Sequence, residues 1–468
     1  MTSPATVTEP ARPIPIWHDA DVCVLGGSCT GLFAALRAAR LGARVVLIEK
    51  QNCFGGVATT SLVNAWHSLY DTEFRQQIIG GLTAEVVQRL GRRGAVQAIE
   101  RSPSFGFIFN SEELKIDLDE LALAEKLRLY LHTQFCAPYL QDGKLAGVFV
   151  ENKSGRGAIL ARYFIDATGD ADLCARLPGI DCYYANHLQP ATACARLEGW
   201  KRLSSHPTDS GISASADRET PFDLGALIRD HREEFGLLEG FTWGCFVPDS
   251  EIFMLAATRI YNINPADADD LTAAEIEGRR QVRAILDLLR RYRPDAPLTL
   301  QALPSRLGLR ESRHVRCQYQ LTGDDVLYGR HFDDAIAYGS YRVDIHHQDR
   351  PGITLRYLDG REEYAVPGRP KQSSRWRGES SVNPTFYQIP LRSMRPVGPY
   401  GNLLIAGRMI DADMTAHAAI RVMVNMNQTG EAAGVACALA ARHHQPVADV
   451  DPRVLRQTLN DGGSKLTC

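Results

Sequence analysis

Residues 21–50, DVCVLGGSCTGLFAALRAARLGARVVLIEK, decide the fold. Apolar residues 22–25 predict a strand, which runs into a glycine turn and then into a helix rich in Ala and Leu. A second apolar strand, residues 45–48, is followed by Glu49. This order of elements predicts a nucleotide-binding unit in which the N-terminus of the helix faces a pyrophosphate.

The turn departs from the G-x-G-x-x-G fingerprint at one position. It reads G-G-S-C-T-G, so Ser28 replaces the middle glycine. Gly26 would allow the tight turn and Gly31 would allow close packing of the helix, while the small Ser28 hydroxyl could bond a phosphate oxygen. Glu49, about twenty residues beyond the turn, is placed to accept hydrogen bonds from a ribose. The alternative is an ordinary tight turn in an α/β domain.

Charge and composition narrow the class of protein. A net charge of −3 and a pI near 6.5 argue against a nucleic-acid or membrane-surface partner. No apolar run approaches the roughly 20 residues of a membrane span, and the N-terminus lacks a secretory pattern. The 11 cysteines include no C-x-x-C pair. We therefore expect a cytoplasmic protein with a small-molecule substrate, no disulfide framework and no metal site.

Other elements follow from the pattern of apolar residues. The spacing predicts helices at residues 82–90, 114–131, 272–292 and 421–441. Strands are expected at residues 131–135 and 402–406, and a hairpin from residues 145–150 and 159–165. The polar segment 349–383, rich in Arg, Gly and Ser, is expected to form a long loop.

Several motifs together resemble a known family. They are GGSCTG with Glu49, CFGGVAT, IDATGDADL, NLLIAGR and TGEAAG, and the more specific ones are GLRESR and IRVM. The chain resembles, from about residue 20 to residue 441, the bacterial FAD-dependent oxidoreductases with a glutathione-reductase-like FAD-binding fold. This resemblance implies an α/β protein in which a Rossmann-like FAD domain is combined with a discontinuous α+β substrate or cap domain.

The implied FAD domain is split along the chain. Its three parts would be residues 18–66, 125–190 and 396–445. Residues 67–124 and 191–395 would form the cap and substrate segments, after a flexible arm at residues 1–17.

The resemblance also implies which residues hold FAD. The pyrophosphate would lie against Gly26, Ser28, Cys29, Thr30 and Gly31, with Thr168 and Gly169 beside it. The adenosine would lie near Glu49, Lys50 and Cys136. The ribityl chain or flavin would contact Gly56, Val57, Ala58, Thr59 and Gly407. Arg408 stands where many relatives carry an acid. Finally, the helix beginning near Arg421, Val422 and Met423 would point its N-terminus at flavin N1 and O2.

Three residues are candidates for chemistry. His67 follows the flavin-contacting stretch and could be a base, a substrate ligand, a covalent flavin anchor or a packing residue. Arg310, in GLRESR, would bind a carboxylate or another oxyanion, or would form a structural ion pair. His346 follows an alternating stretch and could face the pocket, although we favour His67.

The expected activity is oxidation of a small organic substrate, an anionic one if Arg310 binds it, with hydride transfer to flavin N5. The chain has no second glycine fingerprint, no cysteine pair after Gly55 and Gly56, and no halogenase tryptophan motif. A flavin monooxygenase is the alternative within catalysis. A non-catalytic or RNA-modifying flavoprotein is the alternative of another class.

Overall fold

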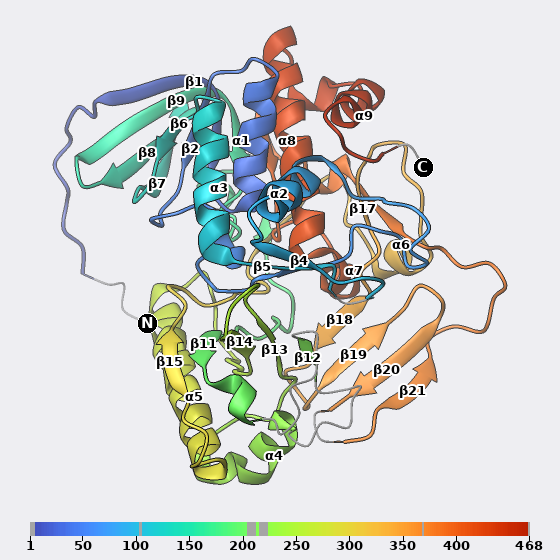
Figure 1. Cartoon of the computed structure of the whole chain (residues 1–468). Helices are drawn as coiled ribbons and strands as arrows, with labels where there is room; N and C mark the ends of the chain where they lie inside the picture. Colours follow the sequence, from blue (N-terminus) through green and yellow to red (C-terminus); the bar gives the residue numbers. More distant parts are fainter. Residues whose placement is uncertain (1–4, 103–104, 204–211, 215–222, 367–368, 467–468) are drawn as a thin grey trace.

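The computed structural model describes residues 5–102, 105–203, 212–214, 223–366 and 369–466 (Figure 1). Its largest sheet has the strand order β6-β2-β1-β9-β8-β7, with β23 also paired to β9. The strands are β1 (Ile16–Leu25), β2 (Val45–Ile48), β6 (Arg128–Tyr130), β7 (Gln134–Gln141), β8 (Lys144–Asn152), β9 (Gly155–Asp166) and β23 (Leu403–Ile405). β6, β2, β1, β9 and β23 are parallel, whereas β7, β8 and β9 pair antiparallel. The protein is therefore a mixed α/β fold built around parallel strands.

Two helices from opposite ends of the chain pack together beside this sheet (Figure 1). α1 (Cys29–Arg40) follows the glycine turn, and α8 (Met423–His443) lies against it. A Cβ at Gly430 would come within 2.0 Å of the Thr30 carbonyl oxygen, and one at Gly434 within 2.1 Å of the Ala34 oxygen. Glycine at these two positions is what allows the helices to approach so closely.

The segment predicted as a cap, residues 67–124, also packs on this layer. α2 (Gly81–Gly91) contacts α8, and α3 (Ser111–Ala124) contacts α1. α3 ends earlier than the predicted helix 114–131, and Lys126 has a φ of 53°, a left-handed value that ends a helix. The strand expected at 131–135 is likewise displaced, because β6 and β7 lie on either side of residues 131–133.

Two further sheets form the other half of the molecule (Figure 1). The first of these sheets has the strand order β12-β13-β14-β11-β15, and helices α4 and α5 lie beside it. Its strands are β11 (Ala195–Glu198), β12 (Ile212–Ala214), β13 (Trp243–Phe246), β14 (Ile252–Ala256) and β15 (Thr299–Ala302). α4 spans Leu224–Phe235, and α5 spans Ala268–Tyr292, as the spacing predicts.

The second sheet corrects the prediction of a long loop at residues 349–383. It consists of β18 (Val343–His346), β19 (Ile353–Arg356), β20 (Arg361–Ala365) and β21 (Gln372–Arg375) in sequential antiparallel order. Ile353, Leu355 and Ala365 are buried together as a small apolar cluster. Alternation over such short strands was masked by the many charged residues on their exposed face.

The remaining elements are short. They are β3 (Ala65–Trp66), β4 (Val96–Ala98), β5 (Phe107–Phe109), β10 (Cys182–Tyr183), β16 (His314–Val315), β17 (Ala335–Gly339), β22 (Tyr387–Pro390), α6 (Gly323–Leu327), α7 (Met414–Ile420) and α9 (Pro452–Asp461), with 3-10 turns at Gly56–Ala58, Cys174–Arg176, Trp200–Leu203, Leu391–Met394 and Val447–Asp449. Within the described residues, no helix has the length and apolar character needed to cross a bilayer.

The large sheet takes its strands from residues 16–48, 128–166 and 403–405. The division of the chain into cap and FAD segments stays a prediction, and so does the arm at residues 1–17, of which residues 1–4 lie outside the described part.

Candidate functional site

The glycine turn lies between β1 and α1 and leaves no room for side chains. Gly26 has a φ of 98°, and a Cβ there would come within 2.3 Å of the Ala167 carbonyl oxygen. A Cβ at Gly31 would come within 1.8 Å of the Gly26 oxygen. Ser28 is the N-cap of α1, and its hydroxyl accepts a hydrogen bond from Gly31 N at 3.4 Å. The turn therefore exposes backbone at the start of a helix, as an anion site requires.

A cavity of about 70 Å³ runs from this turn along the end of β2. Glu49 lies in its wall, and its carboxylate accepts hydrogen bonds from Gly27 N at 2.5 Å and Gln51 N at 2.8 Å. Each carboxylate oxygen keeps a further lone pair for a donor in the cavity. The cavity is lined by Leu25, Gly26, Ser28, Ile48, Glu49, Lys50, Gln51, Cys53, Gly56, Val57, Thr133, Gln134, Phe135, Ala167, Thr168, Gly169, Asp172, Arg306 and Arg408.

A larger cavity of about 320 Å³ lies beside the first. Both are lined by Ser28, Val57, Ala167, Gly169 and Arg408, so they adjoin over the glycine turn. The larger cavity reaches the N-terminus of α8 at Val422 and Met423. No side chain caps this helix end, so its first N–H groups are available to a ligand.

The buried carboxylate of Asp166 holds the backbone of residues 168–174, part of which lies between the two cavities. Asp166 accepts hydrogen bonds from Thr168 N at 3.1 Å and from Leu173 N and Cys174 N at 3.0 Å each. Beside this turn Arg408 pairs with Asp170. Gly169 has a φ of 81°, a left-handed value that favours glycine, and a Cβ there would also displace the Arg408 guanidinium.

His67 lies in the wall of the larger cavity between two aromatic rings. Its ring centre is 4.1 Å from that of Tyr341 and 5.7 Å from that of Phe105. Burial, together with the positive charge of Arg342 and Arg421, lowers the pKa of His67 to about 3. Its Nδ1 has no hydrogen-bond partner among the described residues. His67 is thus a neutral imidazole in the cavity wall, with a buried Nδ1 that the described residues leave unpaired.

Arg310 lines the same cavity, whereas Glu311 points away from it. The Arg310 guanidinium donates to the Pro190 carbonyl oxygen at 2.6 Å and to Thr192 Oγ1 at 2.8 Å. No carboxylate among the described residues forms an ion pair with it. Burial and the nearby Arg259 and Arg421 lower the pKa of Arg310 to about 9. No described carboxylate contacts this guanidinium directly, and Asp344 acts on it only at longer range.

A row of polar side chains of β18 lines the same cavity as Arg310. Arg342, Asp344 and His346 alternate along and just before β18, so they share one face and all line the cavity. Asp344 Oδ1 is 3.4 Å from His346 Nε2, and Oδ2 is 3.3 Å from the Arg421 guanidinium and accepts from the Tyr341 hydroxyl at 2.9 Å.

The titration of this row follows from its charges. Burial opposes ionisation of Asp344, but His346, Arg421 and Arg342 hold its pKa well below the usual range. Burial lowers the pKa of His346 to about 3 despite the adjacent carboxylate. The row therefore presents an ionised acid and a neutral imidazole near neutral pH.

The chain matches the family of FAD dependent oxidoreductases over residues 21–459. It belongs to that family. No curated protein matches the chain at a significant level.

Three solved structures illustrate its likeness to other proteins. A geranylgeranyl bacteriochlorophyll reductase-like protein from Thermoplasma acidophilum is 12% identical at a TM-score of 0.44, covering 95% of this chain and 83% of that one. p-Nitrophenol 4-monooxygenase from Pseudomonas putida is 10% identical at a TM-score of 0.43, covering 95% and 84%. Anhydrotetracycline hydroxylase from Streptomyces rimosus is 13% identical at a TM-score of 0.40, covering 95% and 65%.

The geometry of this FAD-dependent oxidoreductase fits its cofactor. The crowded glycine turn, the acid at the end of β2 and the uncapped start of α8 lie along two adjoining cavities. This arrangement suits a long, twice-charged dinucleotide better than a mononucleotide. Of the residues assigned by resemblance, those that line a cavity are Gly26, Ser28, Cys29, Thr30, Glu49, Lys50, Gly56, Val57, Thr168, Gly169, Gly407, Arg408, Arg421, Val422 and Met423.

Four assigned residues act differently or lie behind the wall. Gly31 accommodates the Gly26 carbonyl, and Ala58 is fully buried. The Thr59 hydroxyl donates to the Phe54 oxygen at 2.7 Å, and the Cys136 thiol lies 3.6 Å from the Gln134 carbonyl oxygen. Gln134 and Phe135 line the smaller cavity at the place expected for Cys136.

The sequence analysis did not identify most of the residues that line the larger cavity away from the glycine turn. The only sequence signal for them was the alternating stretch that ends at His346, because Arg342 and Asp344 lie on the same strand face as His346. The missed lining residues are Phe105, Trp243, Arg306, Tyr341, Arg342, Asp344, Tyr357, Glu363 and Lys371.

Proposed function

We propose that this FAD-dependent oxidoreductase is a dehydrogenase or oxidase of a small organic anion, on an FAD domain of the glutathione-reductase type. The observation that supports the anion is Arg310, a cavity-lining guanidinium with no ion pair to a carboxylate of the described residues. A buried, unbalanced cation is costly, so a bound anion would stabilise the site.

The other charged side chains of the larger cavity also favour an anionic substrate. The basic side chains in the wall of the larger cavity outnumber the acidic ones: Arg310, Arg342, Lys371, Arg408 and Arg421 against Asp344 and Glu363. Asp344 is already engaged with Arg421 and His346. A carboxylate or another oxyanion would therefore meet a site with excess positive charge.

Aromatic side chains supply the rest of the wall. Phe105, Trp243, Tyr341 and Tyr357 face the same cavity as Arg310. The Phe105 and Trp243 ring centres are 5.1 Å apart, and His67 stacks against Phe105. These rings would exclude water and orient an apolar part of the substrate while Arg310 holds its charge.

FAD, when bound, supplies a two-electron acceptor. The protein must then take the proton that accompanies oxidation, and the imidazole of His67 in the cavity wall is the group we propose for this. A pKa of about 3 makes His67 a weak base, but an anion beside it would raise that pKa and improve proton transfer. His346, already paired with Asp344, is the second choice.

The test is anaerobic reduction of the purified flavoprotein by matched pairs of small molecules. Each carboxylate or other oxyanion is compared with its uncharged amide or ester, and bleaching of the flavin absorbance is followed. The proposal expects reduction by an anion and little by its neutral partner. Equal rates for both members of every reducing pair would contradict it.

The monooxygenase alternative has its own test. The described residues contain one glycine turn of the dinucleotide type, and FAD is expected to occupy it. We therefore predict slow or no flavin reduction by NADH or NADPH without substrate. Rapid stoichiometric bleaching by either nucleotide in a stopped-flow mixer would favour the monooxygenase instead.

A further inference from the structure

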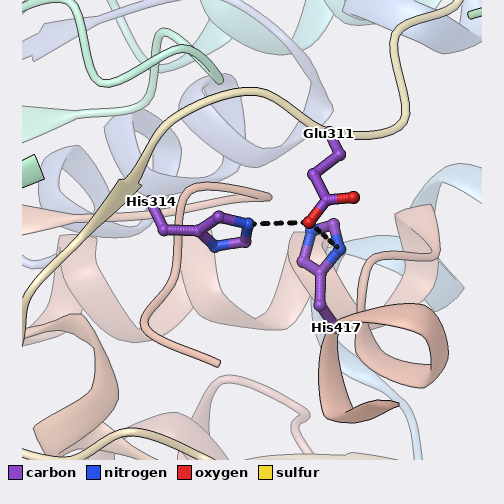
Figure 2. A group of neighbouring side chains, drawn as sticks. All are labelled: Glu311, His314 and His417. Atoms are coloured by element: carbon purple, nitrogen blue, oxygen red, sulfur yellow. Dashed lines mark hydrogen bonds and ion pairs between the residues drawn. The ribbon is translucent and has the colours of Figure 1, made fainter. Parts of the chain in front are cut away.

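Three buried side chains meet behind the cavity wall, outside both cavities (Figure 2). Glu311 Oε1 lies 3.0 Å from His314 Nε2 and 3.6 Å from His417 Nδ1. The three ligand-type atoms all lie within 4.8 Å of one another, and each side chain is at most 1% exposed. Glu311 comes from the GLRESR segment, His314 follows that segment at the start of β16, and His417 comes from α7.

Backbone carbonyls decide which nitrogen of each histidine carries the proton. His314 Nδ1 is 2.9 Å from the Ile410 oxygen, and His417 Nε2 is 3.1 Å from the Arg408 oxygen. A carbonyl only accepts hydrogen bonds, so both of these nitrogens must donate. In the neutral form of each ring, the nitrogen that faces Glu311 is therefore bare.

The triad also contains a buried nitrogen without a partner. His417 Nδ1 is inaccessible to solvent and has no hydrogen-bond partner among the described residues. It lies 3.6 Å from Glu311 Oε1, on the side of the ring that faces the other two side chains (Figure 2). A ligand-type atom is therefore left unsatisfied where water does not reach.

We propose that Glu311, His314 and His417 bind one divalent first-row transition-metal ion. Two imidazoles and a carboxylate are a donor set that such ions prefer. Metal-bound histidines commonly donate their other N–H to a backbone carbonyl, as both do in this protein. Donors about 2.1 Å from one ion stand roughly 3.0–3.4 Å apart, close to the separations found between Glu311 and the two histidines.

The ion would position residues of the cavity. It joins the segment that carries Arg310 to α7, which ends beside Arg421, and both histidines are tied to the Arg408–Ile410 backbone. Three of the arginines that face the cavity would therefore be held by a single centre. This role is structural, and it does not depend on the proposed substrate.

The first experiment measures metal in the flavin-loaded protein. The protein is produced in medium supplemented with Zn²⁺, freed of loosely bound metal with a chelator, and analysed by elemental mass spectrometry. We expect about one Zn²⁺ per chain, because a buried site acquires its metal on folding. If the protein carries its full complement of flavin but less than about a tenth of an equivalent of Zn²⁺, the proposal is overturned.

Variants locate the metal. Glu311→Gln and His417→Asn should each lower the metal content at least about tenfold, because each removes one of only three protein ligands. His347→Asn is the matched control, since it removes another histidine beside a carboxylate, with Asp349 3.8 Å away, and should keep the metal. Metal retained in both triad variants would overturn the assignment.

A measurement on the unaltered protein decides the matter if the variants fail to fold. X-ray absorption at the zinc edge of the wild-type flavoprotein should show two imidazole nitrogens and one or more oxygens near 2.0–2.1 Å. Sulfur ligands, or a single imidazole, would place the metal elsewhere and overturn the proposal.

Discussion

The glycine turn and the arginine-rich wall both line the cavities and would bind ligand in different ways. The turn, residues 26–31, offers backbone N–H groups and crowded Cα atoms. The wall offers the charged heads of Arg310, Arg342 and Arg421 on long side chains. Adding a Cβ to a glycine of the turn should therefore reduce stability and flavin binding more than replacing one arginine guanidinium of the wall.

The largest effect is expected for Gly31→Ala. The new Cβ would come within 1.8 Å of the Gly26 oxygen, so the turn must move. We expect flavin-free protein, destabilised by about 3 kcal/mol. The flavin-to-protein absorbance ratio and a urea unfolding curve measure this. Gly91→Ala, whose Cβ would meet only Val96 at 3.8 Å, is the control and should keep both values. A flavin-loaded Gly31→Ala would refute the importance of backbone crowding.

Glu49→Ala should come next. Its carboxylate supports Gly27 N and Gln51 N and faces the smaller cavity. Losing a charge-assisted hydrogen bond of about 1.5–3 kcal/mol should raise the Kd for FAD roughly 10- to 100-fold. Titration of apoprotein with FAD, followed by flavin fluorescence, tests this. Glu125→Ala removes only a partner of Arg40 on the surface and should leave the Kd unchanged. Unchanged affinity in Glu49→Ala would mean that this acid serves only the turn.

Arg310→Lys tests the wall. Lysine keeps the charge but cannot make a bidentate contact, so the Kd for an anionic probe such as benzoate should rise roughly tenfold. Flavin content and melting temperature should stay near wild type, because Arg310 has no ion pair with a carboxylate of the described residues. Benzoate binding is followed by perturbation of the flavin spectrum. If melting temperature and flavin fall together, Arg310 is instead a structural clamp through Pro190 and Thr192.

The smallest effect concerns His67 and pH. Its pKa falls from 6.5 to about 3 on folding, so the unfolded chain binds more protons between these values. Stability therefore falls as pH drops below 6.5, and His67→Asn should reduce proton uptake on unfolding at pH 5 by about one proton. Calorimetry in buffers of different ionisation enthalpy measures the uptake. His132→Asn, which replaces an exposed histidine in the loop between β6 and β7, is the control. Identical uptake in wild type and His67→Asn would show that His67 titrates normally.

Much of the nucleotide half could be predicted because each of its motifs is a contiguous stretch of chain, although the motifs are far apart in the sequence. The strand at residues 45–48, the helix after the glycine turn and the hairpin of β8 and β9 follow from local apolar periodicity. FAD binding follows from the same short motifs, and the family match confirms it. The sheet at residues 343–375 escaped prediction because its strands are short and half charged.

The candidate site likewise contains residues that the sequence identifies and contacts that only the structure shows. His67, Arg310 and His346 could each be singled out in the sequence, but their partners could not. Asp344 joins Arg421 and His346 only after β18 folds against α7, and Glu311, adjacent to Arg310, turns away to His314 and the distant His417. Side chains of neighbouring residues diverge along an extended backbone, so adjacency in sequence could not tell whether Arg310 and Glu311 face the same site.

The sequence by itself determined the nucleotide-binding unit, the cofactor and the family. These depend on backbone conformations that a few neighbouring glycines and apolar residues dictate. Only the tertiary structure decided which charges face the cavity, which histidine nitrogens are left bare, and that Glu311, His314 and His417 meet. Electrostatic and ligand geometry depends on distances of a few ångströms between segments far apart in the chain, and local patterns carry no information about those distances.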